Sequence, residues 1–80
     1  MERSEVERRV LDLLVEQLGV ERGAVEPESL LEEDLGLDSL GMVELLLALE
    51  EVCGVAFTDE EAGRITTVRG AVDAVMRLGG

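Results

Sequence analysis

The chain has 80 residues, of which 46% are hydrophobic, and it carries a formal net charge of -12. This length fits one small domain, residues 1–80, with a single modest core. Histidine, lysine, tyrosine and tryptophan are missing. The usual general bases, Schiff-base amines and imidazole ligands are therefore missing too, and we do not expect this chain to be an enzyme.

Aromatic and cysteine residues are scarce. Phe57 is the one aromatic residue, which disfavours β-strands and predicts an all-α fold with an aliphatic core. Cys53 is the one cysteine, which excludes an intramolecular disulfide and a multi-cysteine zinc site. We expect Cys53 to be a small core residue rather than a reactive thiol. The first residues lack the apolar core of a signal peptide, so a cytoplasmic protein without membrane insertion is expected.

The negative charge is concentrated in the middle of the chain. No basic residue occurs between Arg22 and Arg64, whereas acidic residues are frequent there. A solvated acidic surface is the plainer interpretation. The more specific one is an electrostatic field that steers basic partner surfaces. Nucleic acid is disfavoured as a partner because phosphate groups would meet like charge.

The first predicted element is an amphipathic helix. Ser4 and Glu7 have the spacing of a capping box at its start, and Gly19 ends it. Its apolar stripe consists of Val6, Val10, Leu14 and Leu18. Residues 20–37 lack periodicity and predict a long loop, with a helical turn near residues 30–33. A loop of this length in a compact domain is typically functional.

The second predicted helix begins at Asp38 or Ser39 and ends at Cys53, before Gly54. At about 100° per residue, one face carries no charge and is predicted to be buried. This face consists of Met42, Leu45, Leu46, Leu49 and Cys53. The opposite face consists of Leu40, Val43, Glu44, Leu47, Glu50 and Glu51. Its glutamates are expected to face water, and its apolar side chains either dock a partner or pack under the loop.

Two further helices are predicted. Thr58 and Glu61 form a second capping-box pattern, but Gly63 follows so closely that the third helix must be short. Thr66 or Thr67 caps a last helix. Its apolar positions are Val68, Ala71, Val72, Val75 and Met76, and Gly79 and Gly80 are expected to fray. The expected architecture is a small four-helix bundle, with three longer helices, a short third helix and a long loop between helices 1 and 2.

The segment Asp34-Leu-Gly-Leu-Asp-Ser-Leu40 resembles the attachment motif of acyl carrier proteins. The resemblance extends over nearly the whole chain. Val43–Glu51 is similar to the second helix of that family, and Asp59–Val68 is similar to its third helix and the entry to the fourth. The resemblance implies that Ser39 carries 4'-phosphopantetheine, donated by coenzyme A, whose thiol holds acyl groups as thioesters. Ser29 lies in a superficially similar tripeptide, but no long helix can follow it before Gly36.

The resemblance also implies partners. A phosphopantetheinyl transferase would modify the chain, and acyl transferases and ketosynthases of fatty-acid or polyketide-type biosynthesis would use it through basic docking surfaces. The implied carrier is a non-catalytic monomer. Its docking residues would be Asp38, Leu40, Val43, Glu44, Leu47, Glu50 and Glu51. The space that shelters an acyl chain would be lined by Leu49, Phe57, Ile65 and Val75.

Two alternatives stay open. Ser-Leu-Gly followed by Val-Glu-Leu-Leu-Leu also resembles D-alanyl carrier proteins, so an aminoacyl carrier, D-alanyl or peptidyl in type, is one. The third-helix segment fits acyl carriers better. The other alternative, from a different class, is an acidic adaptor or calcium-binding module. Asp34 and Asp38 do not have the ligand spacing of an EF-hand loop, and no metal site is predicted.

Overall fold

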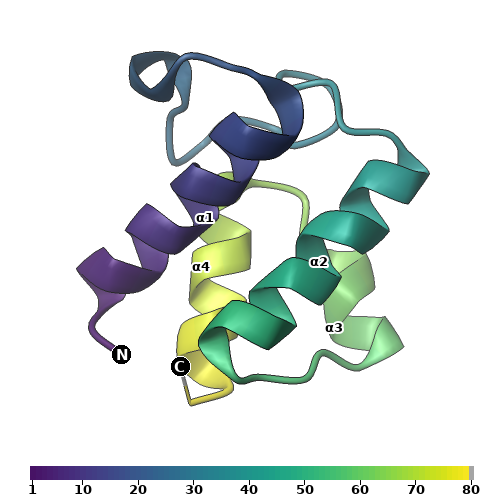
Figure 1. The fold of residues 1–80 in the computed structure, drawn as a ribbon. Helices are drawn as coiled ribbons and strands as arrows, with labels where there is room; N and C mark the ends of the chain where they lie inside the picture. Colours follow the sequence, from purple (N-terminus) through teal and green to yellow (C-terminus); the bar gives the residue numbers. More distant parts are fainter. Residues whose placement is uncertain (80) are drawn as a thin grey trace.

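The computed structural model describes residues 1–79, which contain four α-helices (Figure 1). The helices are α1 (Arg3–Leu18), α2 (Ser39–Cys53), α3 (Asp59–Arg64) and α4 (Val68–Arg77). The predicted all-α bundle with a short third helix is therefore confirmed. A 3-10 turn, η1 (Arg22–Ala24), has no counterpart in the prediction. Gly80, the end of the predicted frayed tail, lies outside the described residues.

Helix α1 packs against both α2 and α4 (Figure 1). It ends as predicted at Gly19, whose φ of 70° is left-handed and whose amide donates to the Val15 carbonyl at 2.9 Å. The predicted cap at Ser4 is wrong. The N-cap is Glu2, and the Glu2 carbonyl already accepts hydrogen bonds from the amides of Glu5 and Val6. Ser4 is thus inside the first turn, where its backbone is helical and cannot adopt the extended capping conformation.

The loop between α1 and α2 is held in place by the segment that joins α3 to α4 and by the first turn of α4. The Leu31 amide donates to the Thr66 carbonyl at 2.9 Å, and the Arg69 amide donates to the Pro27 carbonyl at 2.9 Å. Leu30 and Thr67 form an isolated antiparallel bridge between these bonds. The backbone groups of the loop are thus satisfied beside the core. Residues 31–35 form a hydrogen-bonded turn close to the predicted one.

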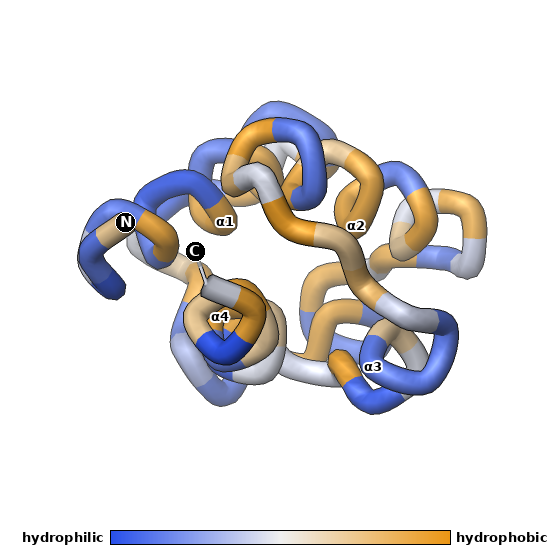
Figure 2. The backbone as a smooth tube through the Cα atoms, turned by 90° about the horizontal axis from the view of Figure 1, so that it is seen from below, coloured by the Kyte–Doolittle hydropathy of each residue, from blue (hydrophilic) through white to orange (hydrophobic). Residues whose placement is uncertain are grey.

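The core is aliphatic, as the composition predicts. Leu45, Leu49 and Cys53 of the charge-free α2 face are buried, while Met42 and Leu46 at its edge are half-buried. The α4 residues that join them in the core are Ala71, Val72, Ala74 and Val75. Figure 2 shows the four helices around one centre, with hydrophobic stretches in α1, α2 and α4, whereas the short α3 is mainly hydrophilic. Across residues 1–79, the helices are too short or too polar to traverse a bilayer.

The caps of the last two helices follow the prediction. Thr58 and Glu61 make the full capping box of α3, with the Glu61 amide 3.1 Å from Thr58 Oγ1 and the Thr58 amide 3.0 Å from Glu61 Oε1. Thr67 rather than Thr66 caps α4, because its Oγ1 accepts from the Gly70 amide at 2.9 Å. These caps fix where α3 and α4 begin and so position the segment that faces the loop.

Candidate functional site

Ser39 is an exposed residue at the first position of α2. Asp38 is the N-cap, and its Oδ1 accepts from the Gly41 amide at 2.7 Å, while its carbonyl accepts from the Met42 amide at 2.9 Å. The amides of Ser39 and Leu40 precede the first intrahelical hydrogen bond, so they are free to bind an anion. The exposed Ser39 hydroxyl therefore lies at the positive end of the α2 helix dipole.

The residues before Ser39 form a fixed turn. Asp34 Oδ2 accepts from the Leu30 amide at 2.8 Å, and Gly36 has a left-handed φ of 83° that a residue with a side chain rarely adopts. Leu37 is 4% exposed, and its amide donates to the Leu31 carbonyl at 3.0 Å. The segment that resembles the attachment motif thus anchors the start of α2 to the core through Leu37 and leaves the side chain of Ser39 in solvent.

Ser29 provides an internal contrast. It is 8% exposed, and its Oγ accepts from the Glu26 amide at 2.9 Å. Its hydroxyl is therefore part of the loop structure and is poorly placed for another protein to reach. Among serines followed by leucine, Ser39 is the one on an exposed helix start.

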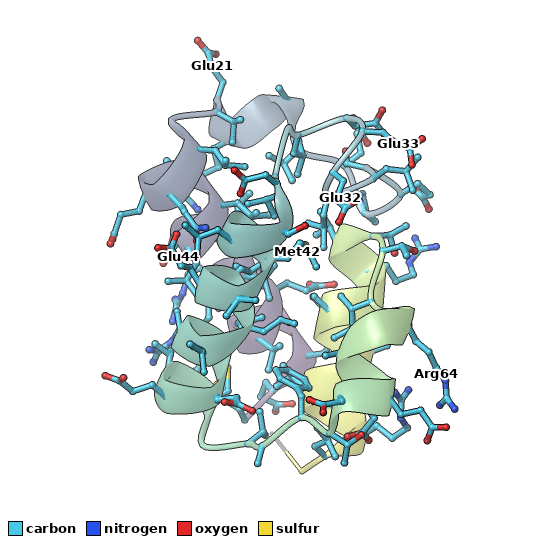
Figure 3. The ribbon with its side chains drawn as sticks, turned by 90° about the vertical axis from the view of Figure 1, so that its right-hand side faces the viewer. Glu21, Glu32, Glu33, Met42, Glu44 and Arg64 are labelled. Atoms are coloured by element: carbon cyan, nitrogen blue, oxygen red, sulfur yellow. The ribbon has the colours of Figure 1, made fainter. Side chains whose placement is uncertain are left out.

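A hollow of about 470 Å³ lies beside Ser39, between the start of α2, the loop and α3. Its lining residues are Leu31, Glu32, Glu33, Ser39, Met42, Val43, Leu46, Ala62, Gly63, Ile65 and Thr66. In Figure 3, Glu32 lies on the loop at the upper end of the space between α2 and α3, and Met42 lies on the α2 side. The hollow thus combines apolar walls with carboxylates at one end.

Of the four residues predicted to line an acyl-chain space, the structure brings Ile65 to this hollow. Leu49 and Val75 are fully buried in the core, and Phe57 is half-buried against it. The hollow instead uses Met42 and Leu46, on the edge of α2. Sequence spacing could have found these two, because they follow Ser39 by three and seven residues and so lie on its side of the helix. Leu31 and Thr66 could not be found this way, because they meet α2 only through tertiary packing.

The α2 face opposite the core is exposed. Leu40 is 66% exposed, Val43 52% and Leu47 58%, so the loop does not cover them. Glu44 and Glu51 are exposed among these apolar side chains, and Figure 3 shows Glu44 pointing away from α3. The predicted mixture of apolar and acidic groups on one solvent-facing surface is what the structure has.

Glu50 differs from the other predicted docking glutamates. It is half-buried, and its Oε2 accepts from the Phe57 amide at 2.7 Å. Glu50 therefore closes the connection between α2 and α3, and one of its carboxylate oxygens is already engaged. The structure leaves Glu44 and Glu51 more accessible to a partner than Glu50.

Two further potential sites have a simple description. Burial raises the pKa of the Cys53 thiol above its usual value, with the Arg9 charge acting in the opposite direction. Cys53 is 8% exposed and belongs to the core. Among the described residues 1–79, no group of three histidine, cysteine, aspartate or glutamate side chains is arranged to hold a metal ion.

Comparison with known proteins agrees with this geometry. A family model described as a phosphopantetheine attachment site matches residues 8–75, from within α1 to within α4. Among solved structures, the acyl carrier protein from Enterococcus faecalis is similar, with 32% sequence identity and a TM-score of 0.87. The match covers 99% of this chain and 100% of that one. The similarity is thus one of the entire fold, including the loop and the short α3.

Proposed function

The chain belongs to the phosphopantetheine-attachment family and has the fold of an acyl carrier protein, and from this membership we propose that a phosphopantetheine arm is attached to the hydroxyl of Ser39. We further propose that it carries acyl groups for fatty-acid or polyketide-type biosynthesis, without catalysis of its own. The observation that carries the proposal is the exposed Ser39 hydroxyl at the capped start of α2, beside a hollow with apolar walls.

The residues around Ser39 fit a phosphopantetheine group. The phosphodiester is an anion, and the free amides at the start of α2 favour an anion there by about 0.3 to 1 kcal/mol. The Asp38 carboxylate opposes this, so we assign Asp38 the roles of cap and recognition by the transferase. When attached, the group supplies a thiol that holds cargo as a thioester. Met42, Leu46 and Ile65 offer apolar surface to an aliphatic cargo beside it.

Intact-mass spectrometry tests the attachment site. After incubation with coenzyme A and a promiscuous phosphopantetheinyl transferase, the protein should gain the mass of one phosphopantetheine. Ser39→Ala should abolish the gain because the accepting oxygen is gone. Ser4→Ala is the matched control, since Ser4 is exposed on α1 and makes no cap bond; it should be modified like the natural chain. A natural chain that stays unmodified would sink the proposal.

We propose that partners bind the exposed face of α2. Glu44 and Glu51 would attract basic surfaces from a distance, while Leu40, Val43 and Leu47 would fill a shallow apolar contact. Exposed ion pairs of about 0 to 1 kcal/mol each favour rapid association without long residence. A carrier that visits several enzymes needs this combination. The cytoplasm suits such a carrier, because a reducing compartment keeps the thiol of the arm free.

An aminoacyl carrier is the second candidate. Glu32 and Glu33 line the hollow beside Ser39, and carboxylates there would attract the ammonium group of an aminoacyl cargo. Charging of the modified protein separates the two candidates. A malonyl transferase should load an acyl carrier, whereas an adenylating amino-acid ligase should load an aminoacyl carrier. Loading by the ligase alone would reverse our preference for an acyl cargo.

A further inference from the structure

One side chain of α1 reaches the first turn of α2. Gln17 is half-buried near the end of α1, and its Nε2 donates to the Gly41 carbonyl at 2.9 Å. Gly41 is buried and lies two residues after Ser39. The carrier function described above gives Gln17 no part, and no pattern in the sequence singles it out.

Gly41 is held from two directions. Its amide donates to Asp38 Oδ1 at 2.7 Å, and its carbonyl accepts from Gln17. A Cβ at this position would lie 2.8 Å from Leu37 Cδ2, 3.1 Å from Asp38 Oδ1 and 3.5 Å from Gln17 Nε2. Glycine therefore lets the cap, the buried Leu37 and the Gln17 amide converge on one backbone unit. Because the core holds Leu37 and α1 carries Gln17, this unit is tied to the rest of the molecule.

We propose that Gln17 is a positioning residue for the modification of Ser39. Its hydrogen bond fixes the first turn of α2 against α1, so that the Ser39 hydroxyl is presented to the transferase in one orientation. The inference rests on the proposed attachment at Ser39. The physical reason is that a transferase binding a frayed helix start would first have to order it, and only the ordered fraction of the protein would bind productively.

Gln17→Met tests the role, because methionine has nearly the length of glutamine, keeps the net charge and lacks the amide donor. We expect kcat/KM for modification to fall about 2- to 10-fold, the range that loss of one hydrogen bond supports. The loss should appear mainly in KM for the carrier. Leu13→Met is the matched control, since Leu13 is half-buried on the same helix; its kcat/KM should equal that of the natural chain.

Hydrogen exchange of the unmodified protein gives a readout that does not depend on the transferase. In Gln17→Met, the amides of Gly41 and Met42, which both donate to Asp38, should exchange faster than in the natural chain, while those of α4 keep their rates. A second variant combines Glu16→Gln with Gln17→Glu. This double substitution keeps the composition and net charge, and it places a carboxylate against the Gly41 carbonyl. It should show the same changes, with Glu16→Gln alone as its control.

The outcomes separate this inference from the proposed function. If the natural chain is modified and both Gln17 variants are modified equally fast, the positioning role is wrong and the carrier function stands. The same conclusion follows if the variants only lower Tm while kcat/KM and local exchange stay unchanged. If the natural chain is not modified at all, the proposed function fails, and the role of Gln17 fails with it.

Discussion

At the scale of single residues, burial decides what each candidate group can do. Ser29 and Ser39 each follow an acidic residue and precede a leucine, yet one hydroxyl is a structural acceptor in the loop and the other is exposed at a helix start. Cys53 is the strongest nucleophile by residue type, but it lies in the core, where burial favours the neutral thiol. The sequence reveals the residue types and their spacing, whereas the surrounding packing determines their accessibility.

The raised pKa of Cys53 predicts slow thiol chemistry in the folded, unmodified protein. At pH 8 the thiolate fraction should be smaller in the folded than in the unfolded chain, and burial further limits access. A thiol-specific chromogenic reagent should therefore react at least about 10-fold faster in denaturant than in native buffer. The contribution of Cys53 to the free energy of unfolding should fall as the pH rises through the usual thiol range, because the thiol of the unfolded chain loses its proton at a lower pH than the buried thiol. Equal rates in both buffers would contradict this burial.

At the scale of elements, local signals predicted well and non-local ones did not. The caps at Asp38, Thr58 and Thr67 depend on side chains within a few residues of the helix start, so the sequence contains them. The box at Ser4 failed although its spacing was right, because the helix begins earlier, at Arg3, with Glu2 as its N-cap. The walls of the hollow that come from the loop and from α3 could not be predicted, since tertiary pairing brings them to α2.

Helix α2 has two faces with different consequences, and two leucines on it test them. Leu45 is fully buried and Leu47 is 58% exposed. Leu45→Ala should lower the free energy of unfolding by about 2 to 5 kcal/mol, through lost transfer energy and the cavity that remains. Leu47→Ala should change it by less than about 0.5 kcal/mol. Chemical denaturation followed by circular dichroism measures both.

Leu47→Ala also tests the docking surface. Leu47→Ala should weaken binding to a partner such as the transferase although its stability is unchanged, because its side chain belongs to the proposed contact. Isothermal titration or surface plasmon resonance would show the change in Kd. If Leu47→Ala bound the partner as tightly as the natural chain, the exposed apolar residues of α2 would be ordinary surface and the docking proposal would need a different face.

At the scale of the whole molecule, acidic and basic residues balance at the two ends of the chain, whereas the stretch between Arg22 and Arg64 is acidic. The ion pairs of the described residues include Arg3 with Asp73 at 2.7 Å, between α1 and α4, and Arg22 with Asp12 at 2.6 Å. Within the acidic stretch between Arg22 and Arg64, the corresponding pairs involve Glu28 and Glu60. Most carboxylates of the loop and α2 are therefore exposed to solvent without an arginine partner among the described residues. The sequence predicts this excess of acidic residues, but only the structure shows which of them form ion pairs with arginine.

This imbalance predicts that salt stabilises the protein. Screening of like charges should raise Tm by roughly 5 °C between 10 mM and 0.5 M NaCl, equivalent to about 1 kcal/mol for a domain of this size. Glu33→Gln removes one charge from the acidic stretch, so it should raise Tm at low salt and reduce the gain from added salt. Glu7→Gln is the matched control, because Glu7 lies 3.5 Å from Arg3 in an exposed ion pair, and its loss should not raise Tm. Differential scanning calorimetry measures all three proteins. A Tm that does not respond to salt would show that repulsion between the carboxylates does not limit stability. The acidic surface would then attract basic partners without lowering the free energy of unfolding.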